Sequence, residues 1–550
     1  MSKFNGKKPG VQMAKNFMGE DAYVLSDKEA LTSMVMTTFL ADSYYVSEGE
    51  LLNNILTLVE KCGYEFAAKL ALYARTKGNL RSVSHLLAAL VCKDSTHPTW
   101  LKSFYEHIVL RPDDISEILA CYGKMNGFDL NKKLRKIPNA MKRGFATVLS
   151  NLSPYQIDKY KMNGKSLSLI DIVNLLHPTP TDKNREAYRR LMHGESLDGT
   201  YDAKILEKEM AETGKNASNE QELVLAKHDA IKSVLEKGMP IMNLLRNLRN
   251  IMLYAPDLID EAIKQLTNHD KIVNSKLLPF RFMTAYDSVN EIEMSDYASE
   301  EFGQKIMFES DMPRMDANML ASIKANVTKA LEDAMSIACE NVPDLEGNCA
   351  ILIDHSGSVR GDWGGDSRVS PWSSVRTAHI GNLFGSIVAF KQKDVYIGMF
   401  GDELISPKID RSIGLLEFNK QTYDKGDACG GATENGLYEF LKNVIKEKKH
   451  IDNFIVFSDM EIGDGGEGGW DYTSRVSCKF KDLFKEFRKI NPNCLTVCCN
   501  IRAQSGTSVF NPNLKVLNVS GWSNNIFDVI SMYKAGKLKS MVEDIEKMEI

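Results

Sequence analysis

The stretch AILIDHSGSVRG, residues 350–361, decides the fold of the C-terminal part of the chain. An apolar run stops at Asp354, and two hydroxyls follow at alternate positions, Ser356 and Ser358. A short apolar run bounded by turn residues predicts a buried strand. Carboxylate and hydroxyl oxygens are the ligands that a hard divalent cation prefers. The stretch therefore predicts a buried strand that ends in a metal site.

The sequence around this stretch alternates between two periods. From about residue 346, the short apolar runs CAILID, VYIGMF, FIVFSD, CLTVCCN and LKVLNV are typical of buried strands. Amphipathic segments lie between them, near 373–391, 434–447 and 475–489. This alternation predicts a mostly parallel, doubly wound, Rossmann-like α/β sheet. The segment VYIGMFGDELISPKI predicts a local hairpin, which would place one antiparallel strand at an edge.

Three further positions complete the candidate metal site. Asp459 ends a second predicted strand, and Thr433 precedes a predicted helix. Ligands bind at the carboxyl ends of the strands in such sheets. The spacing Asp-x-Ser-x-Ser, followed by a distant Thr and Asp, resembles the metal-ion-dependent adhesion site of von Willebrand factor A domains. The resemblance implies that Ser356, Ser358 and Thr433 bind Mg²⁺ or another divalent cation directly, and that Asp354 and Asp459 act through water. The alternative is a domain that keeps the fold while its metal is structural or absent.

Up to about residue 345 the dominant period is helical. In MPIMNLLRNLRNIM, the residues Ile241, Leu244, Leu245 and Leu248 form one apolar stripe. Short breaks at Pro and Gly separate many such segments, which favours an all-α array, although no strict repeat signature is present. We therefore predict two domains, a helical one at 1–345 and an α/β one at 346–550.

The charge of the chain differs between the whole and one part. The formal net charge is -5, but residues 124–190 hold fourteen Lys or Arg and five Asp or Glu. A basic stretch of this kind is typical of a surface that neutralises phosphates, and equally of a solvated helix face. The ten cysteines include no C-x-x-C pair, and the N-terminus has no apolar signal region. We therefore expect reduced thiols, no membrane span and a cytoplasmic protein.

Several stretches resemble the TROVE module, named for telomerase, Ro and vault proteins. They are YARTKGNLRSVSHLLAAL at 73–90, YQIDKYKMNG with LLHP at 155–178, MPIMNLLRNLRN at 239–250 and LPFRFMTAY at 278–286. A TROVE module followed by a von Willebrand factor A domain is the layout of the Ro ribonucleoprotein family. The resemblance implies HEAT-like helical repeats bent into a monomeric ring that the A domain closes. It also implies a noncatalytic protein that binds small noncoding Y-type RNAs on its basic outer face. Single-stranded 3′ ends of misfolded RNAs would enter the central hole, for RNA quality control.

The candidate RNA-binding residues come from the resemblance and from the charge pattern. Lys159 and His177 match family positions that contact RNA, whereas Met162 stands where a basic residue is expected. The basic stretch adds Lys132, Lys133, Arg135, Lys142, Arg143 and Lys161. Arg246 and Arg249, in the TROVE-like stretch at 239–250, are further candidates. Structural alternatives remain, because His177 precedes Pro178 and could cap a helix, and because Arg246 or Arg249 could pair with acids.

Two other classes of function stay open. A protein-interaction adaptor would use the metal site to bind a partner's carboxylate, without a physiological RNA. An enzyme is less well supported, because two carboxylates among neutral hydroxyls differ from the clustered acids of a magnesium nuclease. We expect no DNA partner, and an exoribonuclease is an open partner.

Overall fold

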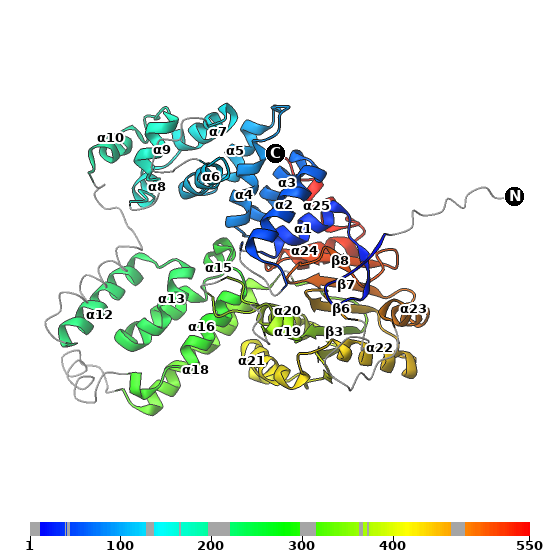
Figure 1. The fold of residues 1–550 in the computed structure, drawn as a ribbon. Helices are drawn as coiled ribbons and strands as arrows, with labels where there is room; N and C mark the ends of the chain where they lie inside the picture. The colour runs from blue at the N-terminus through cyan, green and yellow to red at the C-terminus, as the bar shows by residue number, and fades with distance from the viewer. Residues whose placement is uncertain are drawn as a thin grey trace. The chain divides into compact units, whose positions relative to one another are not determined.

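The computed structural model describes residues 12–38, 40, 45–127, 137–163, 167–195, 220–296, 315–340, 342–361, 367–370, 373–463 and 479–550. The chain forms two compact units. Unit 1 joins Met1–Val148 to Asn341–Ile550, and unit 2 is Leu149–Glu340. The division falls inside α7 (Asn139–Ser150). Figure 1 shows helices in the first part of the chain and a sheet in the last part.

A six-stranded sheet forms the centre of the C-terminal part of unit 1. Its strands lie in the order β5-β4-β3-β6-β7-β9. Their bounds are β3 (Cys349–Asp354), β4 (Val395–Phe400), β5 (Leu404–Ile405), β6 (Asn453–Ser458), β7 (Leu495–Asn500) and β9 (Val516–Ser520). All neighbours pair in parallel except β5, which pairs antiparallel with β4. In chain order this is the doubly wound pattern 3-2-1-4-5-6. The predicted α/β sheet and its antiparallel edge strand are confirmed.

Helices cover this sheet because its strands are apolar on both faces. Every residue of β3 and β6 is buried, as expected for central parallel strands. The helices are α19 (Gly357–Arg360), α20 (Thr377–Lys391), α21 (Leu415–Lys425), α22 (Asn435–Glu447), α23 (Phe480–Ile490), α24 (Asn525–Lys534) and α25 (Met541–Glu546). Helix α20 packs on β3, α22 on β4 and α24 on β9. The 3-10 turns η3 (Arg411–Ile413) and η4 (Gly426–Cys429) flank α21.

The N-terminal part of unit 1 contains strands that the helical prediction did not include. The strands β1 (Met13–Lys15) and β2 (Asp21–Val24) form a hairpin, and β2 pairs with β8 (Thr507–Ser508). The pairing of β2 with β8 joins segments almost five hundred residues apart, so no local pattern reveals it. Further contacts join Ser33 to Ser520 and Tyr73 to Asn525. The compact units thus differ from the predicted halves: the change from helices to sheet near residue 346 is present, but the described residues before 149 belong to the same unit as the α/β part.

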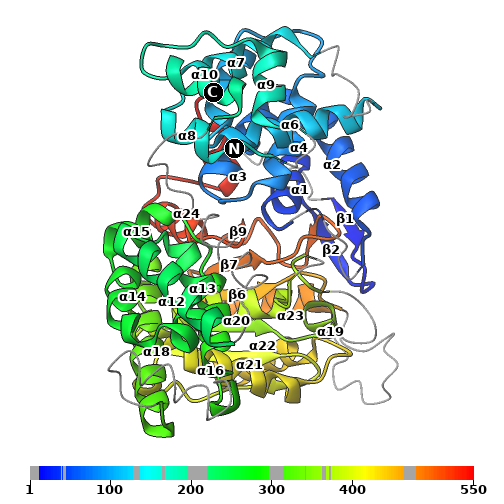
Figure 2. The ribbon, with the colours of Figure 1, turned by 90° about the vertical axis from the view of Figure 1, so that its left-hand side faces the viewer.

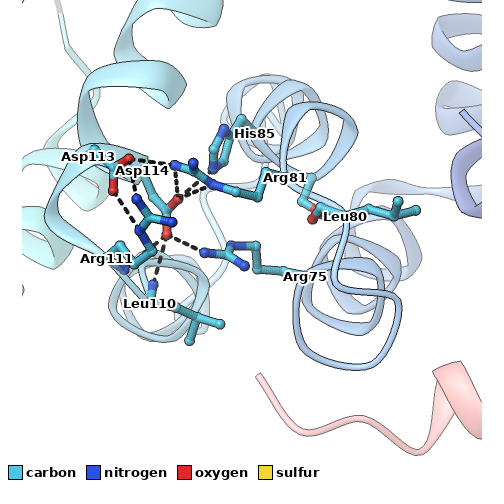
Figure 3. Close-up of polar contacts among 9 residues, drawn as sticks. Arg75, Leu80, Arg81, His85, Leu110, Arg111, Asp113 and Asp114 are labelled. Atoms are coloured by element: carbon cyan, nitrogen blue, oxygen red, sulfur yellow. Dashed lines mark hydrogen bonds and ion pairs between the residues drawn. The ribbon is translucent and has the colours of Figure 1, made fainter. Parts of the chain in front are cut away.

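A buried polar cluster ties three helices of this N-terminal part together. The helices that precede α7 are α1 (Asp27–Met36), α2 (Glu48–Cys62), α3 (Tyr64–Thr76), α4 (Ser82–Val91), α5 (Leu101–Ile108) and α6 (Pro112–Met125). Asp114 in α6 accepts hydrogen bonds from Arg75 of α3, from Arg81 and from His85 of α4 (Figure 3). Arg75, His85 and Asp114 are all buried. The cluster therefore fixes α3, α4 and α6 to one another.

Unit 2 is helical throughout its described residues. Its helices are α8 (Pro154–Lys159), α9 (Leu169–Leu176), α10 (Arg185–His193), α12 (Glu220–Lys237), α13 (Ile241–Tyr254), α14 (Ile259–Leu266), α15 (His269–Ser275), α16 (Phe280–Asn290) and α18 (Ala317–Ala338). The short turns η1 (Pro256–Leu258) and η2 (Met294–Asp296) lie between them. Helices α12, α13, α16 and α18 pack in succession (Figure 2). The predicted stripe of α13 is confirmed, because Ile241, Leu244, Leu245 and Leu248 are buried. The HEAT-like repeat and the ring stay predictions.

Among the described helices, none combines the length and the apolar character that crossing a membrane requires.

Candidate functional site

The first candidate site lies at the carboxyl ends of β3 and β6. Asp354 is the last residue of β3, and Asp459 directly follows β6. The two strands are neighbours in the sheet and belong to the two oppositely wound halves, so this edge is the topological switch point. Both carboxylates are almost completely buried. The parallel register thus brings together two predicted residues that are about a hundred positions apart.

The loop after β3 turns its hydroxyls back towards this edge. The Ser356 amide donates to Asp354 Oδ1 at 2.9 Å, and the Ser458 hydroxyl donates to Asp354 Oδ2 at 2.6 Å. The hydroxyl oxygens of Ser356 and Ser358 are 3.2 Å apart. Both serines are buried at the start of α19. Two neutral oxygens and one carboxylate therefore converge within a single turn.

Thr433 reaches the same edge from the loop before α22. The Gly357 amide donates to the Gly431 carbonyl at 2.9 Å, which joins this loop to the serine turn. The Thr433 hydroxyl and amide both donate to Asp402 Oδ1, each at 2.6 Å. The sequence analysis did not single out Asp402. A signal was present, because Asp402 lies two residues beyond the end of β4 and so follows the same rule of strand ends.

Two further buried carboxylates, Glu434 and Glu461, surround the edge and were also not predicted. Burial raises the pKa of Asp354. Burial, with the negative charges of Asp354 and Glu461, raises the pKa of Asp459. Burial and the charge of Asp354 likewise raise the pKa of Glu434. Among the ion pairs of the described residues, none gives these four acids a basic partner.

The excess of buried negative charge at this edge bears on whether these residues could hold a cation. Buried carboxylates without basic partners are costly unless a proton or a metal ion neutralises them. In the described part of the chain, no three or more His, Cys, Asp or Glu side chains group as metal ligands. A cation here would therefore need the hydroxyls of Ser356, Ser358 and Thr433 beside the carboxylates of Asp354 and Asp459. All five are hard oxygen donors, so the donor set fits Mg²⁺.

The imidazole of His355 is bonded to residues outside the candidate metal ligands. Its Nε2 lies 3.2 Å from Asn382 Oδ1, and Arg360 Nη1 lies 2.7 Å from its Nδ1. Burial and the Arg360 charge lower the pKa of His355 to about 3. Arg360 also stacks over the Tyr423 ring at 4.4 Å. These contacts fix the turn that carries Ser356 and Ser358, and they do not use the hydroxyl of either serine.

The other end of the site is bonded to the N-terminal hairpin. Gln504 Nε2 donates to Asp459 Oδ2 at 2.7 Å, and Gln504 Oε1 accepts from the Tyr45 amide at 3.0 Å. Glu461 accepts from the amides of Phe17 at 2.9 Å and Ser505 at 3.0 Å. The loop after β6 is thereby fixed by residues that lie far away in the sequence.

The second candidate site lies in unit 2, around α8 and α9. The Lys159 ammonium lies 5.2 Å from the Tyr155 ring centroid and 5.6 Å from that of Tyr160. His177 ends α9 in a left-handed conformation, with its ring exposed. Its amide donates to the Val173 carbonyl, so the backbone of His177 does cap a helix. Lys161 is paired with Asp158 at 2.6 Å, which makes it the less available cation.

Met162 follows directly, where a basic residue was expected. Its side chain is buried and its backbone has a φ of 55°. The position therefore serves local packing and presents no charge to solvent.

The remaining basic candidates divide into three groups. Arg249 is bound to Asp296 at 2.8 Å, as the structural alternative supposed. Arg246 is exposed, and its charge together with burial lowers the pKa of Arg281. Lys142 is half-buried and Arg143 exposed on α7; among described residues neither has an ion-pair partner. Lys132, Lys133 and Arg135 lie outside the described residues.

Comparisons with known proteins agree with this architecture. The model of the TROVE domain matches residues 26–234 and 192–347, which together make up more than half of the chain. Telomerase protein component 1 of Mus musculus is 22% identical over 343 residues, or 49% of this chain and 13% of that protein. The Rattus norvegicus protein of the same name is 20% identical over 342 residues, with the same shares. The chain thus spans about an eighth of the length of these curated relatives. The crystal structure of the Deinococcus radiodurans RO (RSR) protein aligns with a TM-score of 0.53 at 15% identity, over 93% of this chain and 100% of that one.

Proposed function

The chain belongs to the TROVE-domain family, as the resemblance to the Ro ribonucleoprotein family predicted, and on this premise we propose that it binds small noncoding RNA without catalysis. Membership of this family implies that the chain binds RNA and forms part of a ribonucleoprotein. The finer proposal is that the chain binds Y-type RNAs on a basic outer surface. It further takes the single-stranded 3′ ends of misfolded RNAs, in the cytoplasm, for RNA quality control.

The observation that carries the proposal is the contact between Lys159 and the Tyr155 ring. Lys159 is half-buried against the exposed Tyr155 ring, and among the described residues no carboxylate forms an ion pair with it. The Leu169 amide at the start of α9 donates to the Lys161 carbonyl, and His177 adds an exposed imidazole at the other end of that helix. A helix of this length spans about 12 Å. A cation beside an open aromatic face, with an exposed imidazole at the other end of the adjoining helix, suits RNA, which is bound through phosphates and stacked bases.

Arg246 supports the same proposal from another helix. It is exposed on α13, and its charge acts on the partly buried Arg281 of α16. Two arginines near each other repel, and a phosphate between them would relieve that repulsion. Arg249 is a weaker candidate, because Asp296 already holds it.

We also propose that unit 1 holds Mg²⁺ through Ser356, Ser358 and Thr433, with Asp354 and Asp459 behind them. The support is the switch-point geometry, together with the buried acids to which no ion pair among the described residues gives a basic partner. In this proposal the α/β part is a von Willebrand factor A-like domain. The closed monomeric ring and an exoribonuclease partner belong to the same proposal.

The experiment for RNA binding compares charge reversals at matched positions. Lys159→Glu with His177→Ala should weaken binding to a stem-loop small RNA by tenfold or more in a filter-binding titration. Lys264→Glu changes the net charge equally on α14, where the Lys264 side chain is 80% exposed, and should leave the affinity almost unchanged. Wild-type affinity should fall steeply with salt, because phosphate neutralisation releases counterions. Equal affinities of the double variant and the wild type would contradict the proposal.

The adaptor hypothesis remains the second candidate because, among the described residues, no ion pair neutralises the four buried acids at the switch point. In that case the cation accepts a carboxylate from a protein partner. Magnesium-dependent capture of a protein from a nuclease-treated lysate, together with RNA binding that is weak at low salt, would favour it over the first proposal.

A further inference from the structure

Asp402 makes an unusual set of hydrogen bonds at the turn between β4 and β5. Its Oδ1 accepts both the amide and the hydroxyl of Thr433, each at 2.6 Å. Its Oδ2 accepts the Ala432 amide at 3.3 Å. A hydroxyl has one hydrogen to donate and two lone pairs to offer. The Thr433 hydrogen is committed to Asp402, and the Asn435 amide donates to the Thr433 hydroxyl oxygen at 3.4 Å. One lone pair of that oxygen therefore remains for another partner.

The two loops are shaped around this carboxylate. The Glu403 amide donates to the Cys429 carbonyl, and the Gly436 amide donates to the Gly401 carbonyl, both at 2.8 Å. Gly430 has a φ of 76°, in the left-handed region that favours glycine. A Cβ at Gly430 would overlap with the Asp402 carboxylate. The backbone therefore leaves a space that Asp402 fills.

The Thr433 loop also faces the serine turn. The Gly431 carbonyl accepts the Gly357 amide, so Thr433 lies two residues from a direct bond to the Ser356–Ser358 segment. The next residue, Glu434, accepts a hydrogen bond from the Gly463 amide at 2.8 Å. Burial and the negative charges of Asp354 and Asp459 raise the pKa of its carboxyl. The Thr433 loop is thus bonded to Asp402 after β4 and, through the Gly357–Gly431 hydrogen bond, to the serine turn after β3.

We propose that Asp402 is a positioning residue for the divalent cation. By accepting the hydrogen bond of the Thr433 hydroxyl, it orients that group and makes its oxygen a stronger ligand for a hard ion such as Mg²⁺ or Mn²⁺. Partners of this kind behind a metal ligand commonly account for 10- to 100-fold in metal affinity. This inference rests on the proposed metal site, but it is independent of the proposed RNA function.

The test measures Mn²⁺ affinity of the full chain by electron paramagnetic resonance. Asp402→Ala should weaken binding about tenfold or more, and Thr433→Val should do the same. Thr433→Ser, which keeps the hydroxyl, should bind almost as the wild type does. Asp410→Asn is the matched control, because Asp410 also accepts a serine amide and hydroxyl, those of Ser412 at 2.9 and 2.6 Å. It should leave Mn²⁺ affinity unchanged. Asp402→Asn keeps the size but loses one acceptor, and should show a smaller loss.

Two readouts separate positioning from a general structural role. If Asp402 acts through Thr433, the double variant Asp402→Ala, Thr433→Val should bind Mn²⁺ no more weakly than Thr433→Val alone. Water-proton relaxation should show one more exchangeable water on Mn²⁺ in Asp402→Ala than in the wild type. Additive losses, unchanged Mn²⁺ affinity in Asp402→Ala, or a wild type that binds no Mn²⁺ would each overturn the inference. RNA titrations with the same proteins report on the RNA proposal separately.

Discussion

Arg75 of α3 and Asp114 of α6 meet in a buried ion pair, with Arg75 Nη2 2.9 Å from Asp114 Oδ2 (Figure 3). His85 Nε2 lies 3.0 Å from the other carboxylate oxygen. The amides of Leu110 and Arg111, at the start of α6, donate to Asp114 Oδ2 at 3.1 and 3.0 Å. A single carboxylate thus satisfies donors from three helices, and its charge suits a helix N-terminus.

Asp114→Asn should lower the free energy of unfolding by about 3–5 kcal/mol, because it leaves the buried Arg75 charge without its partner. Urea unfolding followed by circular dichroism measures the change. Asp182→Asn is the control, since Asp182 pairs with Arg185 while 91% exposed and should change stability little. Similar unfolding midpoints for the two variants would show that the cluster does not hold these helices.

The same carboxylate predicts a pH dependence. Burial alone would raise the pKa of Asp114, but the His85 hydrogen bond and the Arg75 charge hold it well below its usual range. A depressed pKa gives stability that is complete above the unfolded value of about 3.9 and is lost as pH falls towards the folded value. The difference in melting temperature between wild type and Asp114→Asn should therefore shrink as pH falls from 5 to 3. A constant difference over that range would contradict this assignment.

The sequence was sufficient to predict which residues lie at the strand ends of the first site. Asp354 and Asp459 each end an apolar run, and the alternation of strands and helices predicts that these ends share one edge. The sequence was insufficient for Asp402, because its bond to Thr433 depends on how two loops fold onto each other. No local period carries that information, although the end of β4 placed Asp402 at the correct edge.

Unit 2 shows the same division between local and distant information. The apolar stripe of α13 is a local period and was predicted correctly. That Arg249 is paired with Asp296 while Arg246 is exposed could not be predicted, because the choice depends on a neighbour 47 positions away. Charge counts along residues 124–190 likewise do not reveal that Lys161 is paired with Asp158 while Lys159 lies over aromatic rings.

Gly426→Ala should disturb the serine turn from behind. A Cβ at Gly426 would overlap with the His355 ring, which is fully buried and held by Asn382 and Arg360. Overpacking at such a site costs about 1–3 kcal/mol, and the shift should reach Ser356 and weaken Mn²⁺ binding. Calorimetric melting and Mn²⁺ titration measure the two effects. Gly49→Ala meets no atom within 4 Å and is the control; a Gly426→Ala variant as stable as Gly49→Ala would contradict the packing argument.

Removing the candidate metal ligands should separate the two proposed functions. Asp354→Ala with Ser356→Ala deletes a buried carboxylate and a hydroxyl from the switch point, so Mg²⁺ and Mn²⁺ binding should be abolished in calorimetric titrations. Lys159 and His177 belong to unit 2, whereas both substitutions lie in unit 1, so affinity for a stem-loop RNA should remain within about twofold, a change of less than 1 kcal/mol.

The control for this double variant is Asp410→Ala with Ser412→Ala. In the wild type the Ser412 amide donates to Asp410 at 2.9 Å, as the Ser356 amide donates to Asp354, but on an exposed turn. The control should keep both the metal and the RNA. If the Asp354 and Ser356 substitutions abolish metal and RNA binding together while the melting temperature in chelator stays unchanged, then RNA binding depends on the metal site. The two proposed sites would in that case act as one, and the assignment of RNA contacts to Lys159 and His177 alone would be wrong.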